Sequence, residues 1–388
     1  MNVAPTATSI GTATVAATVT ATVAVVFGGP SPEHDVSILT GLQVARTLLE
    51  AQRQVFGLYW SKTGDWFRVP ATLEAADFLD GVPRRADPLR LSVGNEGGFT
   101  EAGGRLARAK AIEFEVAVIC CHGGPGEDGS LQAVFDLAGI SYTGPGAAAA
   151  ALGMDKLAFA GLVADAGLPL LARRLLGPST TDLGFPGPYI VKPRYGGSSL
   201  GIEIVEDLVT AVARLGANPH LRQGAVVEPY RPDLFDLNIA VRLWPEPSLS
   251  GIERPLKSTG SAEILNYTDK YVGGEGMASA PRELPAVLPE ALTAALRSAA
   301  LEIARLAAVR GVARIDFLSN GDAWFVNEVN TVPGSLARYL WVDPPVTFID
   351  LLDAMIEEAR ARPTWRPSAM GADGAVLRSA GGIAAKLG

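Results

Sequence analysis

The sequence predicts a mixed α/β protein of two or three domains. Its 388 residues exceed one typical domain, and a hydrophobic share of 48% is enough for proper cores. Two segments in its first 145 residues run from an apolar strand through a glycine-rich loop into a helical pattern, which is how an α/β unit opens. Near residue 320, two further strands flank an Asn-Gly turn signal and form a predicted β-hairpin.

Composition argues against several partners. With 33 basic and 41 acidic residues the net charge is −8, so neither nucleic acid nor an anionic membrane is an expected partner. No uninterrupted apolar run is long enough to span a membrane. The two cysteines, Cys120 and Cys121, are adjacent and unsuited to a mutual disulfide, which favours a reducing cytoplasmic compartment.

The first 20 residues are rich in Ala and Thr and carry no charged side chain. They lack the positive segment of a secretory signal, so we expect a disordered leader, with a cloning or start-site artefact as the alternative.

The first α/β unit places Glu33 in a glycine loop between the apolar run 23–27 and the predicted helix 38–49. Ligands bind at the carboxyl ends of strands in open α/β sheets, which is where this loop lies. The alternative is a first-turn Glu that complements the helix dipole, and on this segment alone it is favoured. The loop lacks the G-x-G-x-x-G spacing, so it does not predict a dinucleotide site.

The second unit has a buried strand at 114–121, a glycine loop at 122–129, a helix at 130–137 and a short strand at 140–144. His122, one of three histidines, follows the strand and is either structural or functional. We assign 65–110 to loops and edge strands.

The middle of the chain carries features suited to phosphate. A helix is predicted from Met154 to Ala166, followed by a strand, loop and strand over 188–202. Lys192 interrupts an apolar strand, and the run 196–199 offers N–H groups and hydroxyls to phosphate oxygens, unless it is only a flexible hairpin tip. Glu228 ends another strand, and the polar, glycine-rich stretch 267–276 is a candidate lid. Helices are predicted at 288–309 and 348–361, ahead of a loosely held tail.

The hairpin at 313–330 is unusual because polar residues interrupt its apolar strands. These residues are Arg314, Asp316, Asn327, Glu328 and Asn330. A two-residue loop at 320–321 would put Asp316 opposite Phe325 and leave Glu328 and Asn330 on the other face.

A three-residue loop at 320–322 with a bulge would instead pair Asp316 with Val326 and Arg314 with Glu328. This second arrangement gathers oxygen ligands suited to Mg²⁺ on one surface. The alternative is a half-solvated hairpin with ordinary exposed charges. If the polar residues share a face, the turn is not a plain two-residue loop.

From about residue 23 to 361, the chain resembles the D-alanine:D-alanine ligases, members of the ATP-grasp superfamily of carboxylate–amine ligases. The matching motifs occur in family order. They are FGGPSPEHDVS, CHGGPGEDGSLQ, YTGPG, MDK, IVKPRYGGSSLG, NYTDKY, ARIDF and NEVNTVPG.

The resemblance implies an ATP-grasp fold, mixed α/β (α+β), with an N-terminal Rossmann-like pre-ATP-grasp domain. The implied organisation is a leader (1–20), an N-terminal domain (21–146), a central ATP-grasp subdomain (147–231), a C-terminal ATP-grasp and metal-binding subdomain (232–361) and a tail (362–388). ATP would lie between the central and C-terminal subdomains. The resemblance also implies a homodimer, which is the usual oligomeric state in the family.

The implied cofactors are ATP and two Mg²⁺ ions, for which Mn²⁺ is a possible replacement. The residues that match nucleotide contacts are Lys156, Lys192, Ser198, Ser199, Glu228, Asp236 and Lys270. Glu228 looks like the residue that reads the adenine amino group, and Asp236 stands where the family has a ribose-binding Glu. Asp316, Glu328 and Asn330 match the metal ligands.

The family reaction implies roles for further residues. A carboxylate takes the γ-phosphoryl group of ATP, and an amine then attacks the acyl phosphate. Arg314 and the backbone N–H of Gly334 match the groups that stabilise the oxyanion. Glu33, Ser198 and Tyr271 match a trio that anchors the ammonium of the first substrate and holds the lid closed, and His122 matches a histidine beside that substrate. Tyr271 is what dipeptide-forming members carry, where depsipeptide-forming relatives tend to have His.

One segment departs from the family. After Gly334 the chain reaches Leu340 and Trp341 several residues early, which suggests a rebuilt acceptor pocket. Arg338 either binds a substrate carboxylate there or is a surface residue.

The resemblance implies an ATP-dependent ligase of peptidoglycan (cell-wall) biosynthesis with D-alanine as the default donor. The alternatives are a ligase with a different acceptor in specialised metabolism, and a catalytically inactive nucleotide-binding regulatory subunit.

Overall fold

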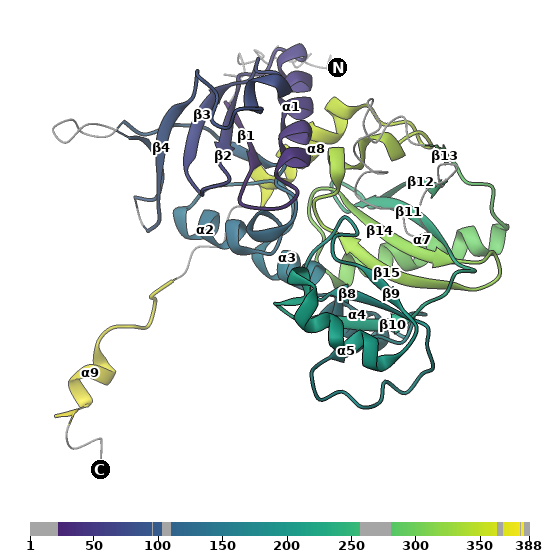
Figure 1. The fold of residues 1–388 in the computed structure, drawn as a ribbon. Helices are drawn as coiled ribbons and strands as arrows, with labels where there is room; N and C mark the ends of the chain where they lie inside the picture. Colours follow the sequence, from purple (N-terminus) through teal and green to yellow (C-terminus); the bar gives the residue numbers. More distant parts are fainter. Residues whose placement is uncertain are drawn as a thin grey trace, which may run out of the picture.

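The computed structural model describes residues 22–94, 96–102, 110–256, 281–362, 368–380 and 382–383. Within these ranges the strands form three sheets, which occupy three regions of the molecule (Figure 1). The predicted leader and the candidate lid, with Lys270 and Tyr271, lie outside the described residues. The three sheets fall inside the three predicted domains, whose exact boundaries stay a prediction.

The N-terminal sheet has the strand order β5-β4-β3-β2-β1-β6. Its strands are β1 (Val23–Gly28), β2 (Val55–Trp60), β3 (Trp66–Pro70), β4 (Asp87–Ser92), β5 (Gly98–Glu101) and β6 (Val116–Ile119). Strand β1 runs parallel to both β2 and β6, so the loops after β1 and β6 emerge at the same edge of the sheet. The two predicted α/β units therefore bring their glycine loops together.

Helices cover both faces of this sheet. Helix α1 (His34–Glu50) packs on one face together with α8 (Phe348–Ala361), and α2 (Ser130–Ala138) packs on the other. Short 3-10 turns lie at η1 (Ala75–Phe78) and η2 (Gly124–Gly126). Cys120 and Cys121 belong to the two different cores, and both are buried free thiols. Helix α8, although late in the sequence, thus stabilises the N-terminal sheet.

The central sheet is antiparallel, with the order β7-β10-β8-β9. Its strands are β7 (Arg174–Leu176), β8 (Tyr189–Pro193), β9 (Glu203–Val205) and β10 (Ala225–Pro229). Helices α3 (Ala147–Met154) and α4 (Lys156–Asp165) lead into it, and α5 (Leu208–Ala217) and η3 (Pro219–Leu221) lie between β9 and β10. The predicted helix is confirmed as α4, and the order of strand, loop and strand is confirmed, although the second strand begins at Glu203, just beyond the predicted segment 188–202.

The C-terminal sheet is also antiparallel, with the order β13-β12-β11-β14-β15. Its strands are β11 (Phe235–Arg242), β12 (Ser248–Pro255), β13 (Arg282–Glu283), β14 (Ala313–Ser319) and β15 (Trp324–Asn330). Helix α7 (Glu290–Leu306) and residues Phe159 and Val163 of α4 cover one face. The short segment η4 (Gly334–Leu340), a 3-10 element interrupted by left-handed residues, then leads to α8. One face of the sheet is therefore core, which leaves the other for a site.

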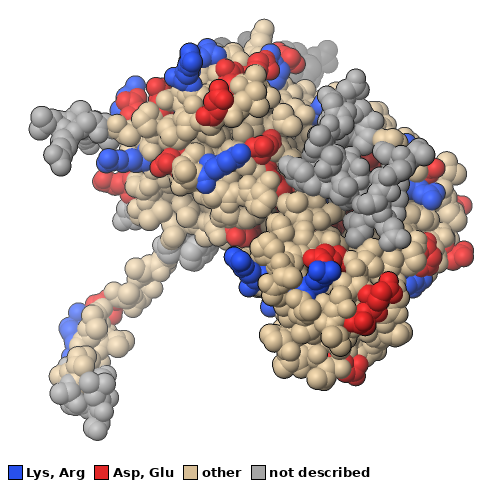
Figure 2. Space-filling model, in the orientation of Figure 1, with Lys and Arg blue, Asp and Glu red and all other residues tan. Residues whose placement is uncertain are grey.

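The surface and the tail add two observations. On the face shown in Figure 2, the described acidic and basic side chains are interspersed, so the net charge of −8 is not gathered into one patch there. None of the described helices is long and apolar enough to cross a membrane. Near the C-terminus, α9 (Ala375–Ser379) lies apart from the three sheets (Figure 1).

The contact between α1 and β1 depends on a glycine and gives a test of the fold. A Cβ atom at Gly41 would lie 2.5 Å from three atoms of the buried Phe27 side chain, whereas a Cβ at Gly161 of α4 would meet nothing within 4 Å. Both glycines are inside helices, so Ala gains about 1 kcal/mol of helix propensity at either position. We expect G161A to be neutral or stabilised and G41A to lose about 1–3 kcal/mol through overpacking. Urea unfolding measures both, and equal stability of the two variants would contradict this account of the packing.

Candidate active site

The hairpin of β14 and β15 has a longer loop than predicted. Ser319 pairs with Trp324, so residues 320–323 form a four-residue loop. The Asn320 side chain closes this loop by accepting hydrogen bonds from the N–H groups of Asp322 (3.2 Å) and Ala323 (2.9 Å). The prediction that the turn is not a plain two-residue loop is confirmed.

The pairing of the strands differs from both predicted registers. Phe317 pairs with Val326, but Asp316 pairs with Glu328, so Asn327 is an extra residue on β15 that forms a bulge. The predicted pairs Asp316 with Val326 and Arg314 with Glu328 are therefore wrong, because the loop has four residues and the bulge lies within the strand rather than in the turn. The prediction that the polar residues share a face is confirmed.

The bulge is what gathers these residues. Without it, a four-residue loop would place Asn327 opposite Asp316 and turn Glu328 toward the core face. With it, Val326 and Val329 both join the core under α7, while Glu328 and Asn330 face the same side as Asp316 and Arg314. We call this side of the sheet the polar face.

Charged contacts organise the polar face around Asp316. Arg314 donates two hydrogen bonds of 2.7 Å to the two oxygens of Asp316, and the Asn330 amide donates a third of 2.9 Å. Burial alone would lower the pKa of Arg314, but the Asp316 carboxylate raises that pKa well above its usual value. Arg314 is therefore a permanent cation of the site.

Strand β11 extends the polar face. Asn238 pairs with Asp316, and Asp236, two residues earlier, lies on the same side. The Asn238 amide donates to Glu253 at 2.9 Å, and Arg282 forms an ion pair of 2.8 Å with that carboxylate. Sequence reasoning missed Glu253, which lies in the mixed polar and apolar strand β12 and belongs to none of the matching motifs.

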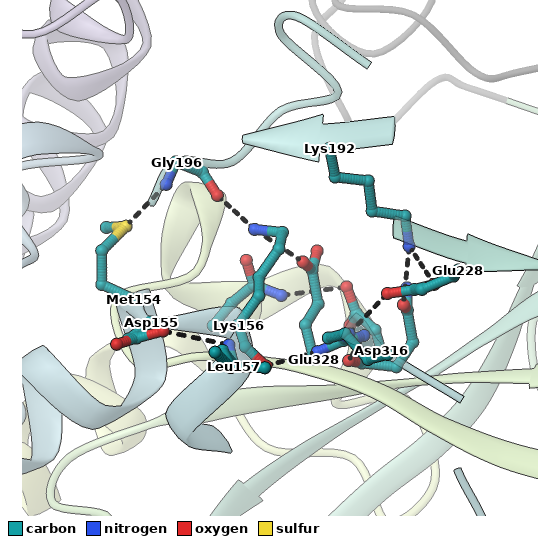
Figure 3. Close-up of polar contacts among 12 residues, drawn as sticks. Met154, Asp155, Lys156, Leu157, Lys192, Gly196, Glu228, Asp316 and Glu328 are labelled. Carbon is teal, nitrogen blue, oxygen red and sulfur yellow. Dashed lines mark hydrogen bonds and ion pairs between the residues drawn. The ribbon is translucent and has the colours of Figure 1, made fainter. Parts of the chain in front are cut away.

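Lys156 links the central sheet to the hairpin (Figure 3). Asp155 caps α4 by accepting from the N–H groups of Leu157 and Ala158, so Lys156 starts the helix in a fixed position. Its buried ammonium donates to the carbonyl of Gly196 at 2.5 Å and lies 3.5 Å from Glu328 Oε2. The glycine loop predicted to bind phosphate therefore faces the polar face of the hairpin across this lysine.

Glu228 is the centre of a second charged group. It is 1% exposed, and its two oxygens bind Lys192 Nζ at 2.7 Å and Arg173 Nε at 2.5 Å. Burial would raise the pKa of Glu228, but Lys192 and then Arg173 hold it below its usual value. Lys192 also lies 3.4 Å from the Asn327 amide oxygen. Sequence reasoning missed Arg173, which belongs to no motif.

The two N-terminal loops meet the central glycine loop at Glu33. The Ser198 hydroxyl donates to Glu33 Oε1, which joins the first loop to the central subdomain. Glu33 occupies the position that caps α1, yet its side chain makes no capping hydrogen bond. Gly123 has φ +62°, which favours glycine, and a Cβ there would also displace Glu33 Oε2.

Glu127, which sequence reasoning also missed, lies close enough to Glu33 for their charges to interact. It accepts from the N–H groups of Gly123 (2.9 Å) and Val332 (3.3 Å). Burial, and then the nearby Glu33 charge, raise the pKa of Glu127 to about 7. No local sequence pattern predicts that Glu127 accepts from Val332, because the two residues are 205 positions apart.

His122 connects the N-terminal sheet to the segment that contains Gly334. Its Nε2 lies 2.8 Å from Thr40 Oγ1, and its Nδ1 lies 2.9 Å from the carbonyl of Val332. Thr40 Oγ1 also accepts from the N–H of Ser335 at 3.1 Å. We therefore place the hydroxyl proton toward Nε2 and the ring proton on Nδ1, which makes the imidazole neutral. Burial lowers the pKa of His122 to about 4.

The segment after Gly334 forms a left-handed turn. Ser335, Leu336 and Ala337 have φ near +50°, a conformation that costs each non-glycine residue about 1–2 kcal/mol. Leu336 and Ala337 are fully buried, whereas Arg338 is exposed with its guanidinium 5.3 Å from the centre of the Phe348 ring.

The donor set of the polar face fits a hard divalent cation. Among the described residues, no group of three or more His, Cys, Asp or Glu side chains is placed to hold a metal. The hairpin offers two carboxylates and one amide, Asp316, Glu328 and Asn330, and Mg²⁺ is usually bound through one or two carboxylates together with phosphate oxygens. These residues can therefore hold the ion that a bound nucleotide triphosphate requires.

Two antiparallel sheets are joined through Lys156, Lys192 and an oxygen-rich hairpin, an arrangement that fits an ATP-grasp ligase. Two family models, described as the D-ala D-ala ligase N-terminus and C-terminus, match residues 22–145 and 151–357. The chain belongs to the D-alanine:D-alanine ligase family and is an ATP-dependent ligase.

Individual relatives agree with the family models. The D-alanine–D-alanine ligase of Corynebacterium aurimucosum is 32% identical over 88% of this chain and 98% of its own length. That of Rhodococcus erythropolis is 30% identical over 88% and 97%.

Solved structures support the fold. The D-alanine-D-alanine ligase from Coxiella burnetii matches 88% of this chain and 94% of its own with a TM-score of 0.70 at 21% identity. The VanG D-Ala:D-Ser ligase from Enterococcus faecalis matches 87% and 99% with a TM-score of 0.72 at 24% identity.

The neutral state of His122 predicts how stability depends on pH. The unfolded chain takes up a proton near pH 6.5, whereas folded His122 resists protonation down to about 4. Its contribution is therefore complete above pH 6.5 and is lost as the pH falls toward 4, by about 3 kcal/mol over the whole range. Urea unfolding at pH 7, 5.5 and 4.5 measures the free energy of unfolding. As the pH falls, this free energy should decrease less for H122Q than for the wild type. H220Q, at an exposed histidine, is the control and keeps the wild-type slope; equal slopes for all three would refute the neutral assignment.

Proposed function

We propose that this ligase joins the carboxyl group of D-alanine to the amino group of a second amino acid, by default another D-alanine, for cell-wall synthesis. The observation that carries the proposal is Lys156, whose ammonium lies between the Gly196 carbonyl and Glu328. This contact brings the glycine loop that we propose to bind phosphate close to the hairpin that we propose to bind the metal. The curated relatives named as D-alanine–D-alanine ligases over nearly their whole length support the choice of substrate.

ATP would lie between the central and C-terminal sheets. Lys156 and Lys192 bind its phosphates, and Ser198 and Ser199 cover them. Glu228, held ionised, can only accept hydrogen bonds and so recognises the amino group of adenine. Asp236 lies on the polar face, where it binds the ribose. Lys270, outside the described residues, keeps its predicted nucleotide contact.

Asp316, Glu328 and Asn330 would hold two Mg²⁺ ions, with Mn²⁺ as a substitute. When bound, these ions neutralise charge on the phosphoryl group as it is transferred. The chain itself keeps the hairpin donors in place through Arg314, which binds Asp316 from the side.

The chemistry proceeds in two steps. A carboxylate oxygen of the first amino acid forms a bond to the γ-phosphorus of ATP. At the same time the bond between the γ-phosphorus and the oxygen that bridges it to the β-phosphate breaks, which releases ADP. The amine nitrogen of the second amino acid then attacks the acyl carbon, phosphate leaves with the electrons of the broken C–O bond, and the nitrogen loses a proton. Arg314 has N–H groups beyond the two that bind Asp316, and these and the Gly334 N–H stabilise the oxyanion.

The first substrate would bind where the three glycine loops meet. Glu33 anchors its ammonium group, Ser198 fixes Glu33, and Tyr271 belongs to the lid. His122 lies beside this substrate and acts through position, because both of its ring nitrogens already bind protein groups.

A second candidate function differs from the first only in the amine acceptor. The tight turn after Gly334 favours a rebuilt acceptor pocket, so a ligase with another amine acceptor is the alternative. Arg338 remains a prediction for an acceptor carboxylate. No observation favours an inactive regulatory subunit. A homodimer and a cytoplasmic location, in keeping with two free thiols, complete the proposal.

Phosphate release distinguishes the two acceptors. With ATP, Mg²⁺ and D-alanine alone, we expect steady release of phosphate together with a dipeptide that mass spectrometry detects. L-alanine in place of D-alanine is the control. Release that requires an added amine would reject D-alanine as the acceptor and support the alternative.

Glu328→Gln tests the metal site. The amide keeps the shape but loses the charge that a divalent cation needs, so we expect the rate at saturating ATP to fall by about 100-fold or more. The Mg²⁺ concentration for half-maximal rate should rise. E246Q, at an exposed turn position between β11 and β12, is the matched control. An E328Q enzyme with wild-type rate and Mg²⁺ requirement would exclude Glu328 as a ligand.

A further inference from the structure

Arg173 lies just before β7 and is 8% exposed. Burying a guanidinium is costly unless its donors are paired, so its contacts need an explanation. Neither its sequence context nor the proposed nucleotide contacts include it.

The fork of Arg173 binds three separate segments. Nε donates to Glu228 Oε1 at 2.5 Å, Nη1 to the carbonyl of Lys156 at 2.7 Å, and Nη2 to the carbonyl of Asn327 at 3.0 Å. These partners belong to the end of β10, the start of α4 and the bulge of β15. A planar group held at three points by rigid elements cannot leave Glu228 when a ligand arrives.

Lys192 binds the other oxygen of Glu228 but is held more loosely. Its contacts are the 2.7 Å ion pair with Glu228 and a 3.4 Å contact with the Asn327 amide, both through one ammonium at the end of a flexible chain. Without Arg173, Lys192 would be the sole cation that the described part of the chain places on a carboxylate that is 1% exposed. Moving Lys192 to a phosphate would then leave a buried, unpaired charge, which is strongly destabilising.

Two cations on one carboxylate leave the group with a net positive charge, so it can attract an anion and release Lys192 at the same time. We propose that Arg173 is a positioning residue that serves as the permanent counterion of Glu228 and thereby frees Lys192 to bind the nucleotide phosphates. The proposal rests on the proposed nucleotide site and adds a residue that itself touches no nucleotide.

The test is ADP binding by calorimetry, which needs neither turnover nor a second substrate. Arg173→Met removes the charge at similar length, and we expect ADP to bind about 10- to 100-fold more weakly, the range for a lost charged interaction. R174M, at the exposed neighbouring arginine, should bind ADP as the wild type does. Circular dichroism and thermal melting establish that each variant is folded.

A double variant separates charge compensation from mere structural support. If Arg173 acts by neutralising Glu228, removing that charge makes Arg173 dispensable, so R173M/E228Q should bind ADP within about threefold of E228Q alone. If Arg173 only supports the Lys156 and Asn327 carbonyls, E228Q will not rescue R173M. A persistent gap between the double variant and E228Q, or wild-type affinity in R173M, overturns the proposal.

Two further outcomes are possible: R173M does not fold, or the wild-type protein does not bind ADP. Should R173M fail to fold, R173M/E228Q has no buried carboxylate left at position 228 that lacks its Arg173 partner, and it is compared with E228Q by the same threefold criterion. Wild-type protein that does not bind ADP at all would instead refute the proposed function, which keeps the two failures distinct.

Discussion

The extra residue in β15 is the constraint on which the site depends. Asn327 shifts the pairing of β14 and β15 by one position, and side chains in a strand alternate between faces. The residues before the bulge keep Val326 in the core, and those after it turn Glu328 and Asn330 to the polar face. One hairpin thus supplies a full core surface and a full ligand surface, which no regular pairing of this sequence would do.

The bulge is also where the two ATP-grasp sheets are joined. The Asn327 carbonyl accepts from Arg173, and its amide oxygen lies near Lys192, both from the central part of the chain. On the next residue, Glu328 reaches Lys156. The site is therefore built from buried charges that are paired across the sheets, and such pairs persist only where each charge has a partner. A bound triphosphate would replace carboxylates as the partner of the lysines, which makes the same contacts suitable for binding.

The sequence predicts those parts of the fold whose signals are local. The strand at 23–27 follows from its apolar run, and the helix at 348–361 is likewise found where the sequence predicts it. The meeting of the Glu33 and His122 loops required the structure, because it depends on the parallel pairing of β1 with β6. The hairpin register required it too, because it depends on Asn320 closing a four-residue loop and on a bulge stabilised by residues from another sheet. The contacts of Arg173 and Glu127 could not be predicted from the sequence for the same reason. Their partners lie up to 154 and 205 residues away, and no spacing along the chain records such contacts.

The left-handed turn after Gly334 shows how the N-terminal domain supports the segment proposed to line the acceptor side. Three non-glycine residues with positive φ store strain of about 1–2 kcal/mol each, so this turn persists only because its surroundings hold it. The burial of Leu336 and Ala337 is one support, and the chain of hydrogen bonds from Val332 through His122 and Thr40 to Ser335 is the other. The hydrogen bonds come from α1 and the loop after β6, whereas η4 packs against β11, β12 and β14 of the C-terminal sheet as well as against α1. The N-terminal domain therefore helps to fix the position of the Gly334 N–H, the group that we propose to stabilise the oxyanion.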